Sequence, residues 1–194
     1  MKNSFLVGNV STSGPDVPVV STELSFKDLM GAVMVRWGIN RNNFRVEPGL
    51  YAVGIPNVSS DVFVTANYKL SFDHLRKNLA GLNGWILVLD TKGVNVWCAA
   101  GKGTFGTKEL VSRIMQVSLG EIVNHKRLIL PQLGATGVAA HKVKEETGFN
   151  VHYGPVRASD IKRFISDGYR ADKEMRKVTF KLAERLKLIP NDFM

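Results

Sequence analysis

The feature that most constrains the fold is an uninterrupted apolar run, Trp85-Ile86-Leu87-Val88-Leu89, in the middle of the chain. A strand that is apolar at every position has to be covered on both faces, as in a parallel sheet between helices. Shorter β-rich runs at 61–66, 128–130 and 151–153 alternate with stretches of helical spacing. Those stretches are 71–79, 107–117, 138–146 and 159–166. The alternation predicts an α/β fold, Rossmann-like, with a mostly parallel sheet and helices on both faces.

The N-terminal quarter has a different pattern. Gly14-Pro15, Val17-Pro18 and Glu47-Pro48-Gly49 interrupt it, and a short helix capped at Ser25 is expected to run to Met34. We therefore expect residues 1–55 to form an irregular N-terminal arm that packs on a core domain of residues 56–190. At 178–188 the pattern fits either a strand or a helix.

Composition excludes several classes of protein. The chain has 194 residues, 44% of them hydrophobic, which suits one globular domain. Its single cysteine excludes an internal disulfide, a four-cysteine iron–sulfur cluster and a cysteine-rich zinc site. No stretch reaches the ~20 apolar residues of a membrane span, and no signal peptide is evident. We expect a soluble, cytoplasmic domain.

The net charge of +9 leaves several partners open: nucleic acid, an anionic lipid surface, an anionic ligand, or none beyond solvent. Nine basic residues lie between Lys162 and Lys187, mixed with acidic and apolar residues. No nucleic-acid-binding motif is present, so we expect no specific binding to DNA.

Ligands of open parallel sheets bind beyond the carboxyl ends of the strands. The segments expected there are rich in small, amide and hydroxyl side chains. They are Thr65–Tyr68, Asp90–Gly93, Pro131–Gly134 and Tyr153–Arg157. Ordinary turn chemistry would explain any one of them, but four on one rim indicate a ligand site.

The most informative segment is 95–107, which contains the only cysteine, Cys98, followed by small residues. It is not a Walker phosphate loop, because Val96 and Gly103 stand where that motif needs Gly and Ser or Thr. The four histidines show no paired metal-ligand spacing. From composition alone, a lone cysteine is more often a small buried hydrophobe than a functional thiol.

The octapeptide Asn95-Val96-Trp97-Cys98-Ala99-Ala100-Gly101-Lys102 closely resembles the cap-helix motif of the corrinoid protein of microbial mercury methylation. The similarity extends over roughly residues 7–190. It includes 35–39, 46–54, 64–73, 130–135 and 153–158. A more distant resemblance is to the corrinoid domain of the iron–sulfur methyl carrier of the acetyl-CoA pathway, whose large subunit carries it.

The resemblance implies a base-off corrinoid, such as cobalamin, held on the rim of the sheet. Cys98 would be the catalytic residue and the metal ligand, binding cobalt from the lower face. The implied cofactor-binding residues are Thr65, Asn67, Tyr68, Asn95, Val96, Trp97, Ala99, Ala100, Gly101, Lys102, Gly103, Thr104, Pro131, Gln132, Leu133, Gly134, Tyr153, Gly154, Pro155 and Val156.

The function implied is a corrinoid-dependent methyltransferase that passes methyl to mercury(II) to give methylmercury. A ferredoxin-like iron–sulfur protein would supply electrons, and a separate methyltransferase would supply methyl. Longer members of that family are anchored in the cytoplasmic membrane, so this chain would meet a membrane only through a missing C-terminal domain. The alternatives are a corrinoid methyl carrier of one-carbon metabolism and a basic module that binds nucleic acid or a membrane surface.

Overall fold

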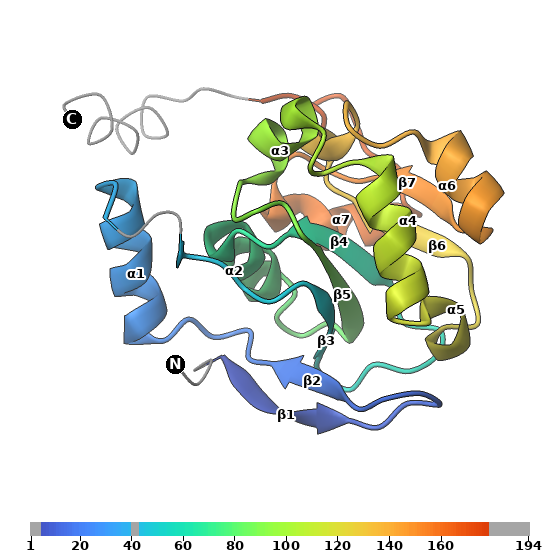
Figure 1. Cartoon of the computed structure of the whole chain (residues 1–194), viewed down its shortest axis with the longest axis horizontal. Helices are drawn as coiled ribbons and strands as arrows, with labels where there is room; N and C mark the ends of the chain where they lie inside the picture. The colour runs from blue at the N-terminus through green and yellow to red at the C-terminus, as the bar shows by residue number, and fades with distance from the viewer. Residues whose placement is uncertain (1–4, 40–42, 179–194) are drawn as a thin grey trace.

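The computed structural model describes residues 5–39 and 43–178, which form a seven-stranded sheet with helices on both faces (Figure 1). The strand order is β1-β2-β3-β5-β4-β6-β7. The strands are β1 Leu6–Val10, β2 Val17–Val20, β3 Gly49–Val53, β4 Val62–Ala66, β5 Gly84–Leu89, β6 Arg127–Leu130 and β7 Asn150–Tyr153. The predicted α/β class is confirmed.

The parallel part of the sheet is β5-β4-β6-β7. Every residue of β4 and β5 is buried, which explains the uninterrupted apolar run in the sequence. On the other side, β3 pairs antiparallel with β5, and β2 then pairs parallel with β3. The sheet is therefore mixed at the end that the N-terminal residues build.

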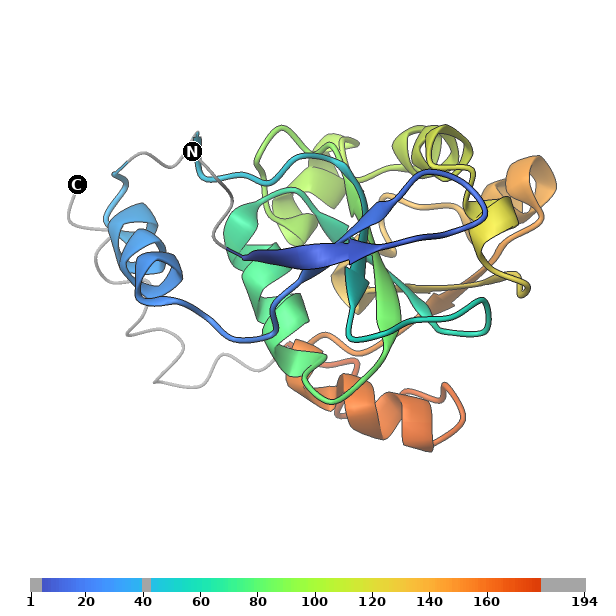
Figure 2. The same ribbon diagram turned by 90° about the horizontal axis from the view of Figure 1, so that it is seen from below.

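Helices cover each face over a separate apolar core. The helices are α1 Phe26–Arg36, α2 Lys69–Asn78, α3 Val96–Lys102, α4 Thr107–Gln116, α5 Leu119–Ile122, α6 Ala140–Thr147 and α7 Ile161–Ser166. Phe72 of α2 and Phe164 of α7 lie in one core, while Ala99, Leu110 and Val143 of α3, α4 and α6 lie in the other. Figure 2 shows the two helical layers on opposite sides of the sheet.

The N-terminal region is more regular than an irregular arm. It contributes β1, β2 and β3 to the sheet, and α1 begins after Ser25 as predicted. Ser25 and Asp28 form a capping box, in which each side chain accepts a hydrogen bond from the other residue's backbone N–H. The division into an arm of residues 1–55 and a domain of residues 56–190 stays a prediction. Most of the ambiguous stretch 178–188 lies outside the described residues.

Three local features differ from the expectations of the sequence pattern. The pattern predicts a helix cap at Thr107, but Thr107 is the first residue of α4, and its hydroxyl oxygen accepts a hydrogen bond from the Ala139 N–H at 2.9 Å. The pattern at 94–97 fits a short strand or the lead-in to a turn, but Asn95 is the N-cap of α3 and the helix begins at Val96. Helix α7 starts at Ile161, two residues later than expected, because a short 3-10 turn precedes it.

A buried cluster of charges ties α1 to α2. The Arg76 side chain is fully buried and donates hydrogen bonds to Asp73 Oδ1 at 2.7 Å and Asp28 Oδ2 at 2.8 Å. Lys69 Nζ donates to both carboxylates at 2.6 Å. The two cations and two anions compensate each other, so the cluster fixes the position of α1 without leaving an unpaired buried charge.

We expect the stability of the protein to fall between pH 3.8 and about pH 2 through Asp28. Burial alone would raise the pKa of Asp28, but hydrogen bonds from Lys69 and Ser25 outweigh it and lower the pKa from 3.8 to about 2. A lowered folded-state pKa stabilises the protein above the unfolded value, and this contribution, about 2 kcal/mol, is lost as acid protonates the folded form. Urea unfolding of wild type and Asp28→Asn across this range measures it. An identical pH dependence in both proteins would contradict the assignment.

Candidate functional site

The connections of the sheet create a crevice at the carboxyl ends of β4 and β6. These two strands are neighbours, and the chain leaves β4 toward α2 on one face but leaves β6 toward α6 on the other. The loops after the two strands therefore diverge. Such a point, where the connections change sides, is where open α/β sheets bind ligands.

A cavity of about 570 Å³ occupies this crevice. Its walls come from the ends of β4 and β6, from α2, from the start of α3 and from the segment after β7. Its size lies within the range of about 300–1,000 Å³ that is usual for cofactor and small-molecule sites. The cavity is thus large enough to take a sizeable part of a cofactor.

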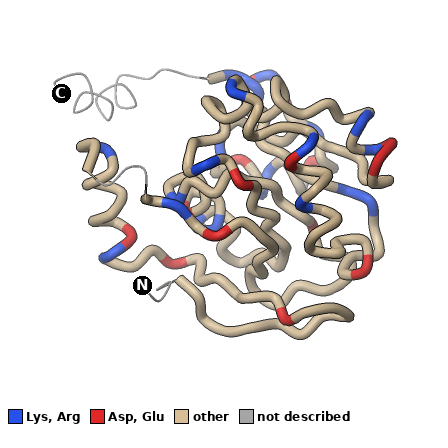
Figure 3. Tube along the Cα trace, viewed as in Figure 1, with Lys and Arg blue, Asp and Glu red and all other residues tan. Residues whose placement is uncertain are grey.

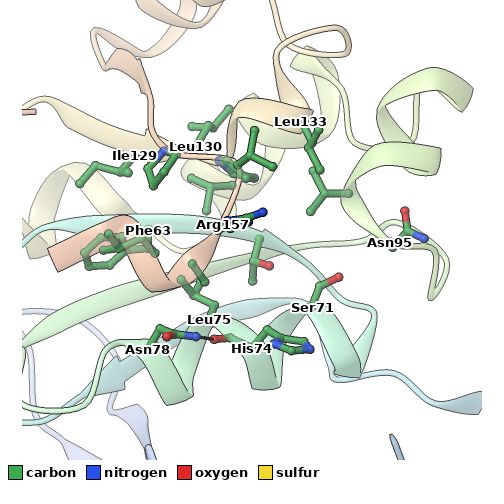
Figure 4. A pocket seen from close by; sticks show the side chains of 18 of the residues that line it. Phe63, Ser71, His74, Leu75, Asn78, Asn95, Ile129, Leu130, Leu133 and Arg157 are labelled. Carbon is green, nitrogen blue, oxygen red and sulfur yellow. Dashed lines mark hydrogen bonds between the residues drawn. The ribbon is translucent and has the colours of Figure 1, made fainter. Parts of the chain in front are cut away.

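Most of the cavity wall is apolar, with a few polar groups placed around it. Figure 4 shows Ser71 and His74 on α2, with Leu133 and Arg157 across the cavity and Asn95 at the side of α3. Thr65 adds a hydroxyl from the end of β4. An apolar pocket with a small number of fixed polar groups favours a large ligand with an apolar body and hydrogen-bonding edges.

Helix α3 stands at the mouth of the cavity. Asn95 is its N-cap, and the Asn95 side-chain oxygen accepts a hydrogen bond from the Cys98 backbone N–H at 2.9 Å. The helix ends at Gly103, whose φ of 79° is left-handed. Both ends of the short helix are therefore defined by its own sequence, which fixes the backbone that carries Cys98.

The two sides of α3 have different surroundings. Ala99 and Ala100 are buried, and a Cβ on Gly137 would lie 3.0 Å from the Ala100 Cα, so only glycine lets that loop pack so closely on the helix. Trp97, Cys98 and Gly101 lie on the opposite, exposed side. Cys98 is an exposed free thiol and not the buried hydrophobe that composition alone favours. Its accessibility leaves it available for chemistry.

Asn67 links the ends of two strands beneath α3. Its side chain is almost fully buried, and Oδ1 accepts hydrogen bonds from the backbone N–H groups of Thr91 at 3.1 Å and Gly93 at 2.9 Å. Its Nδ2 donates to Asp90 Oδ1 at 3.3 Å. Asn67 thereby holds the loop after β5, which leads into α3, against the end of β4.

Comparison with known proteins decides the family. The CO dehydrogenase/acetyl-CoA synthase delta subunit family matches residues 19–165, about three quarters of the chain. The chain belongs to this family. The matched stretch runs from the second half of β2 through most of α7 and contains every residue that lines the cavity.

Relatives of this chain include the gamma subunit of the acetyl-CoA decarbonylase/synthase complex of Archaeoglobus fulgidus, which is 32% identical to it over 146 residues. That match covers 73% of this chain and 31% of the relative. The corrinoid/iron–sulfur protein large subunit of Moorella thermoacetica is 32% identical over 122 residues, covering 62% of this chain and 27% of the relative. The chain thus spans less than a third of the length of either relative. The resemblance to the acetyl-CoA pathway carrier is confirmed, whereas mercury methylation has no support among these relatives.

The structure places nine of the predicted cofactor-binding residues on the cavity wall of this family member. They are Thr65, Tyr68, Asn95, Val96, Trp97, Pro131, Leu133, Pro155 and Val156. The others lie outside the wall: Asn67, Ala99, Ala100, Gly101, Lys102, Gly103, Thr104, Gln132, Gly134, Tyr153 and Gly154. Cys98 also lies outside the wall, directly after Trp97, which is part of it. Binding of a cofactor by any of these residues stays a prediction.

Helix α2 and Arg157 contribute to the cavity wall although neither is among the binding residues predicted from the sequence. Ser71, His74 and Asn78 line the cavity from one side of α2, and Asn78 Nδ2 donates to the His74 carbonyl at 2.7 Å. Their spacing of three and four residues, in a helix that directly follows a strand end, is the signal that would have revealed them. Arg157 was recognised within a rim loop but not assigned to the site.

Two features are absent from the residues that the structure describes. Residues 5–39 and 43–178 contain no group of three or more His, Cys, Asp or Glu side chains arranged to hold a metal ion. Within the same ranges no helix is long and apolar enough to cross a membrane. A cytoplasmic location stays a prediction.

Proposed function

We propose that this chain is a corrinoid-binding domain that takes part in methyl transfer. The observation that carries the proposal is the cavity at the switch point of the sheet, which is lined in part by Trp97 of a short, doubly capped helix. The next residue of that helix is the exposed Cys98. The relative from Moorella thermoacetica is named as the large subunit of a corrinoid/iron–sulfur protein. The family to which this chain belongs matches the residues that build the cavity. This supports the same class of cofactor here.

The residues present fit a corrinoid. A corrinoid is a broad, flat ring with an apolar face and an amide-bearing edge. A Cβ on Gly101 would meet no atom within 4 Å, so the space over the exposed side of α3 is open to a broad group. Thr65, Ser71 and Asn78 are among the polar side chains of a mostly apolar wall. When bound, a corrinoid supplies a cobalt centre that can accept and release a methyl group.

Cys98 is proposed to hold cobalt from the lower face. Its thiol is exposed, and the hydrogen bond from its backbone N–H to Asn95 fixes the turn that carries it. A thiolate donates electrons more strongly than an imidazole, and a thiolate ligand is known to favour bond cleavage at haem iron. Cys98 would therefore favour departure of the methyl group with its bonding electron pair.

The acceptor that we propose for this methyl group is mercury(II). It is an electrophile, and a methyl group arriving with its electron pair converts it to methylmercury. Because the methyl group would leave with the bonding electron pair, the cofactor would need two electrons before it could accept another methyl cation. The chain has one cysteine and no four-cysteine cluster of its own, so a separate ferredoxin-like partner would return the electrons. The support for mercury is the octapeptide 95–102 and the exposure of Cys98.

A second candidate is a corrinoid methyl carrier of the acetyl-CoA pathway, and the comparisons favour it. Several relatives are named as subunits of acetyl-CoA decarbonylase/synthase complexes, which implies protein partners for them. In that case the chain would accept methyl from a methyltransferase and pass it to another enzyme. Cys98 would then not be needed for the transfer.

The experiment that tests the proposal offers both acceptors to one preparation. The protein is reconstituted with methylcobalamin, freed of unbound cofactor, and given either mercury(II) or tetrahydrofolate with a corrinoid-specific methyltransferase. We expect methylmercury to form faster than with the same amount of free methylcobalamin. Methylation of tetrahydrofolate with no such acceleration toward mercury would favour the carrier, and failure to bind methylcobalamin would overturn both candidates.

A further inference from the structure

Helix α1 exposes an apolar stripe along its whole length. The residues lie at the helical spacing i, i+3, i+4, i+7, i+8 and i+11, which places them on one side. They are Phe26, Leu29, Met30, Val33, Met34 and Trp37, between 41% and 75% exposed. Soluble domains rarely expose a continuous apolar patch without a binding role.

The helix is attached to the protein by its opposite side, which carries Asp28, Gly31 and Val35. Asp28 and Val35 are buried, and a Cβ on Gly31 would lie 2.6 Å from the Phe44 ring. A surface helix normally turns its apolar side toward the core, and α1 does the reverse. Figures 1 and 2 show α1 at one end of the molecule, set apart from the sheet.

The charges beside the stripe are positive. At 100° per residue, Lys27 and Arg36 fall on opposite flanks of the stripe, and Figure 3 shows a basic residue near each end of α1. The only acidic residue of the helix, Asp28, is engaged by Arg76 and Lys69 in the buried cluster. The outward side of α1 therefore combines apolar side chains with cations and no exposed carboxylate.

We propose that α1 docks on an anionic phospholipid surface. The stripe would lie in the boundary between headgroups and acyl chains, with Lys27 and Arg36 reaching the phosphates. Phe26 and Trp37 stand at the two ends of the stripe, and tryptophan is enriched at membrane–water interfaces. The net charge of +9 attracts the whole chain to the same surface. This docking goes beyond the proposed function and does not depend on it.

A second copy of the chain is a poorer occupant. A helix of 11 residues is about 16 Å long and about 10 Å wide, so two such stripes face to face bury less than the about 1,000 Å² of a stable interface. Pairing would also bring the Lys27 and Arg36 flanks of both copies together. A lipid surface does not need a minimum protein–protein contact area, and its phosphates attract Lys27 and Arg36 instead of repelling them.

The test is co-sedimentation of the full chain with vesicles of phosphatidylcholine and phosphatidylglycerol, beside vesicles of phosphatidylcholine alone. Val33→Glu places a charge in the centre of the stripe, and Met115→Glu, at a 58% exposed apolar position of α4, is the matched control. We expect the wild type and Met115→Glu to bind the anionic vesicles. Val33→Glu should bind at least tenfold more weakly, and replacing both Lys27 and Arg36 by glutamine should also weaken binding.

Several outcomes would overturn the proposal. Failure of the wild type to bind any vesicles would contradict it. It would equally be contradicted if Val33→Glu bound as tightly as the wild type, or if the wild type bound neutral and anionic vesicles equally. A dimer in sedimentation velocity that Val33→Glu dissociates, without vesicle binding, would assign the stripe to a second copy. A photo-crosslinker at position 33 that reacts within the chain with residues 179–194 would assign it to that segment. Circular dichroism of each variant verifies that the fold is retained.

Discussion

Replacing Cys98 by alanine is expected to reduce methyl transfer to mercury(II) at least about a hundredfold while leaving the fold intact. Loss of a group that merely supports a metal ligand costs about 10–100-fold, so loss of the ligand itself should cost at least as much. The thiol is exposed, and its backbone N–H still donates to Asn95 in the variant. The free energy of unfolding should therefore change by no more than about 0.5 kcal/mol.

Two companion variants separate the possible roles of this thiol. Cys98→His restores a ligand with weaker electron donation, so methyl transfer should stay low even where the visible spectrum shows axial ligation. Met115→Ala, at an exposed position of α4, controls for changes in preparation and should transfer methyl at the wild-type rate. Methylmercury formation, measured per bound corrinoid, is the readout. A wild-type rate in Cys98→Ala would show that the thiolate has no role in the transfer.

Ser71→Trp is expected to weaken cobalamin binding at least about a hundredfold. Ser71 lines the cavity from α2 and is only partly buried, so a tryptophan can extend into the space without entering the core. A tryptophan side chain can bury about 150–250 Å² of surface, so it would take up space that the cofactor needs. A hundredfold loss corresponds to about 2.7 kcal/mol of binding free energy.

The matched control for this substitution is Ser112→Trp. Ser112 is an exposed serine on α4, away from the cavity wall, and it should tolerate the same ring with unchanged affinity. Isothermal titration with cobalamin measures both variants, and thermal unfolding verifies that they are folded. If Ser71→Trp binds as tightly as wild type while both remain folded, the cofactor does not occupy this cavity.

The core of the fold was predictable because burial leaves a local signature. The all-apolar run of β5 could belong only to a strand covered on both faces, and the glycines at 148 and 168 marked helix ends. The N-terminal strands were less visible. Strand β2 contains Pro18, and β1 is exposed at four of its five positions, so neither shows the apolar pattern of a central strand. Their positions depend on pairing with each other and with β3, which sequence spacing does not reveal.

The site was predictable only in part, for reasons of side-chain direction. Thr65, Pro131 and Pro155 could be predicted because ligands bind beyond the carboxyl ends of parallel strands, and these ends share one edge of the sheet. The position of Asn67, two residues after Thr65, does not reveal that its side chain turns inward and accepts hydrogen bonds from the loop after β5. The role of α2 depends on which side of the helix faces the crevice. That is a property of packing between layers, not of local sequence.

The most direct test of the account is the visible spectrum of cobalamin during titration with the protein, for wild type and Cys98→Ala. If the cavity binds a base-off corrinoid and Cys98 holds the metal, the wild type should shift the spectrum saturably to a new axially ligated form. Cys98→Ala should bind but give a different spectrum, because the sulfur donor is missing. A spectrum that stays that of free cobalamin at saturating wild-type protein would contradict the central claim, and identical shifted spectra for both proteins would contradict the role of Cys98.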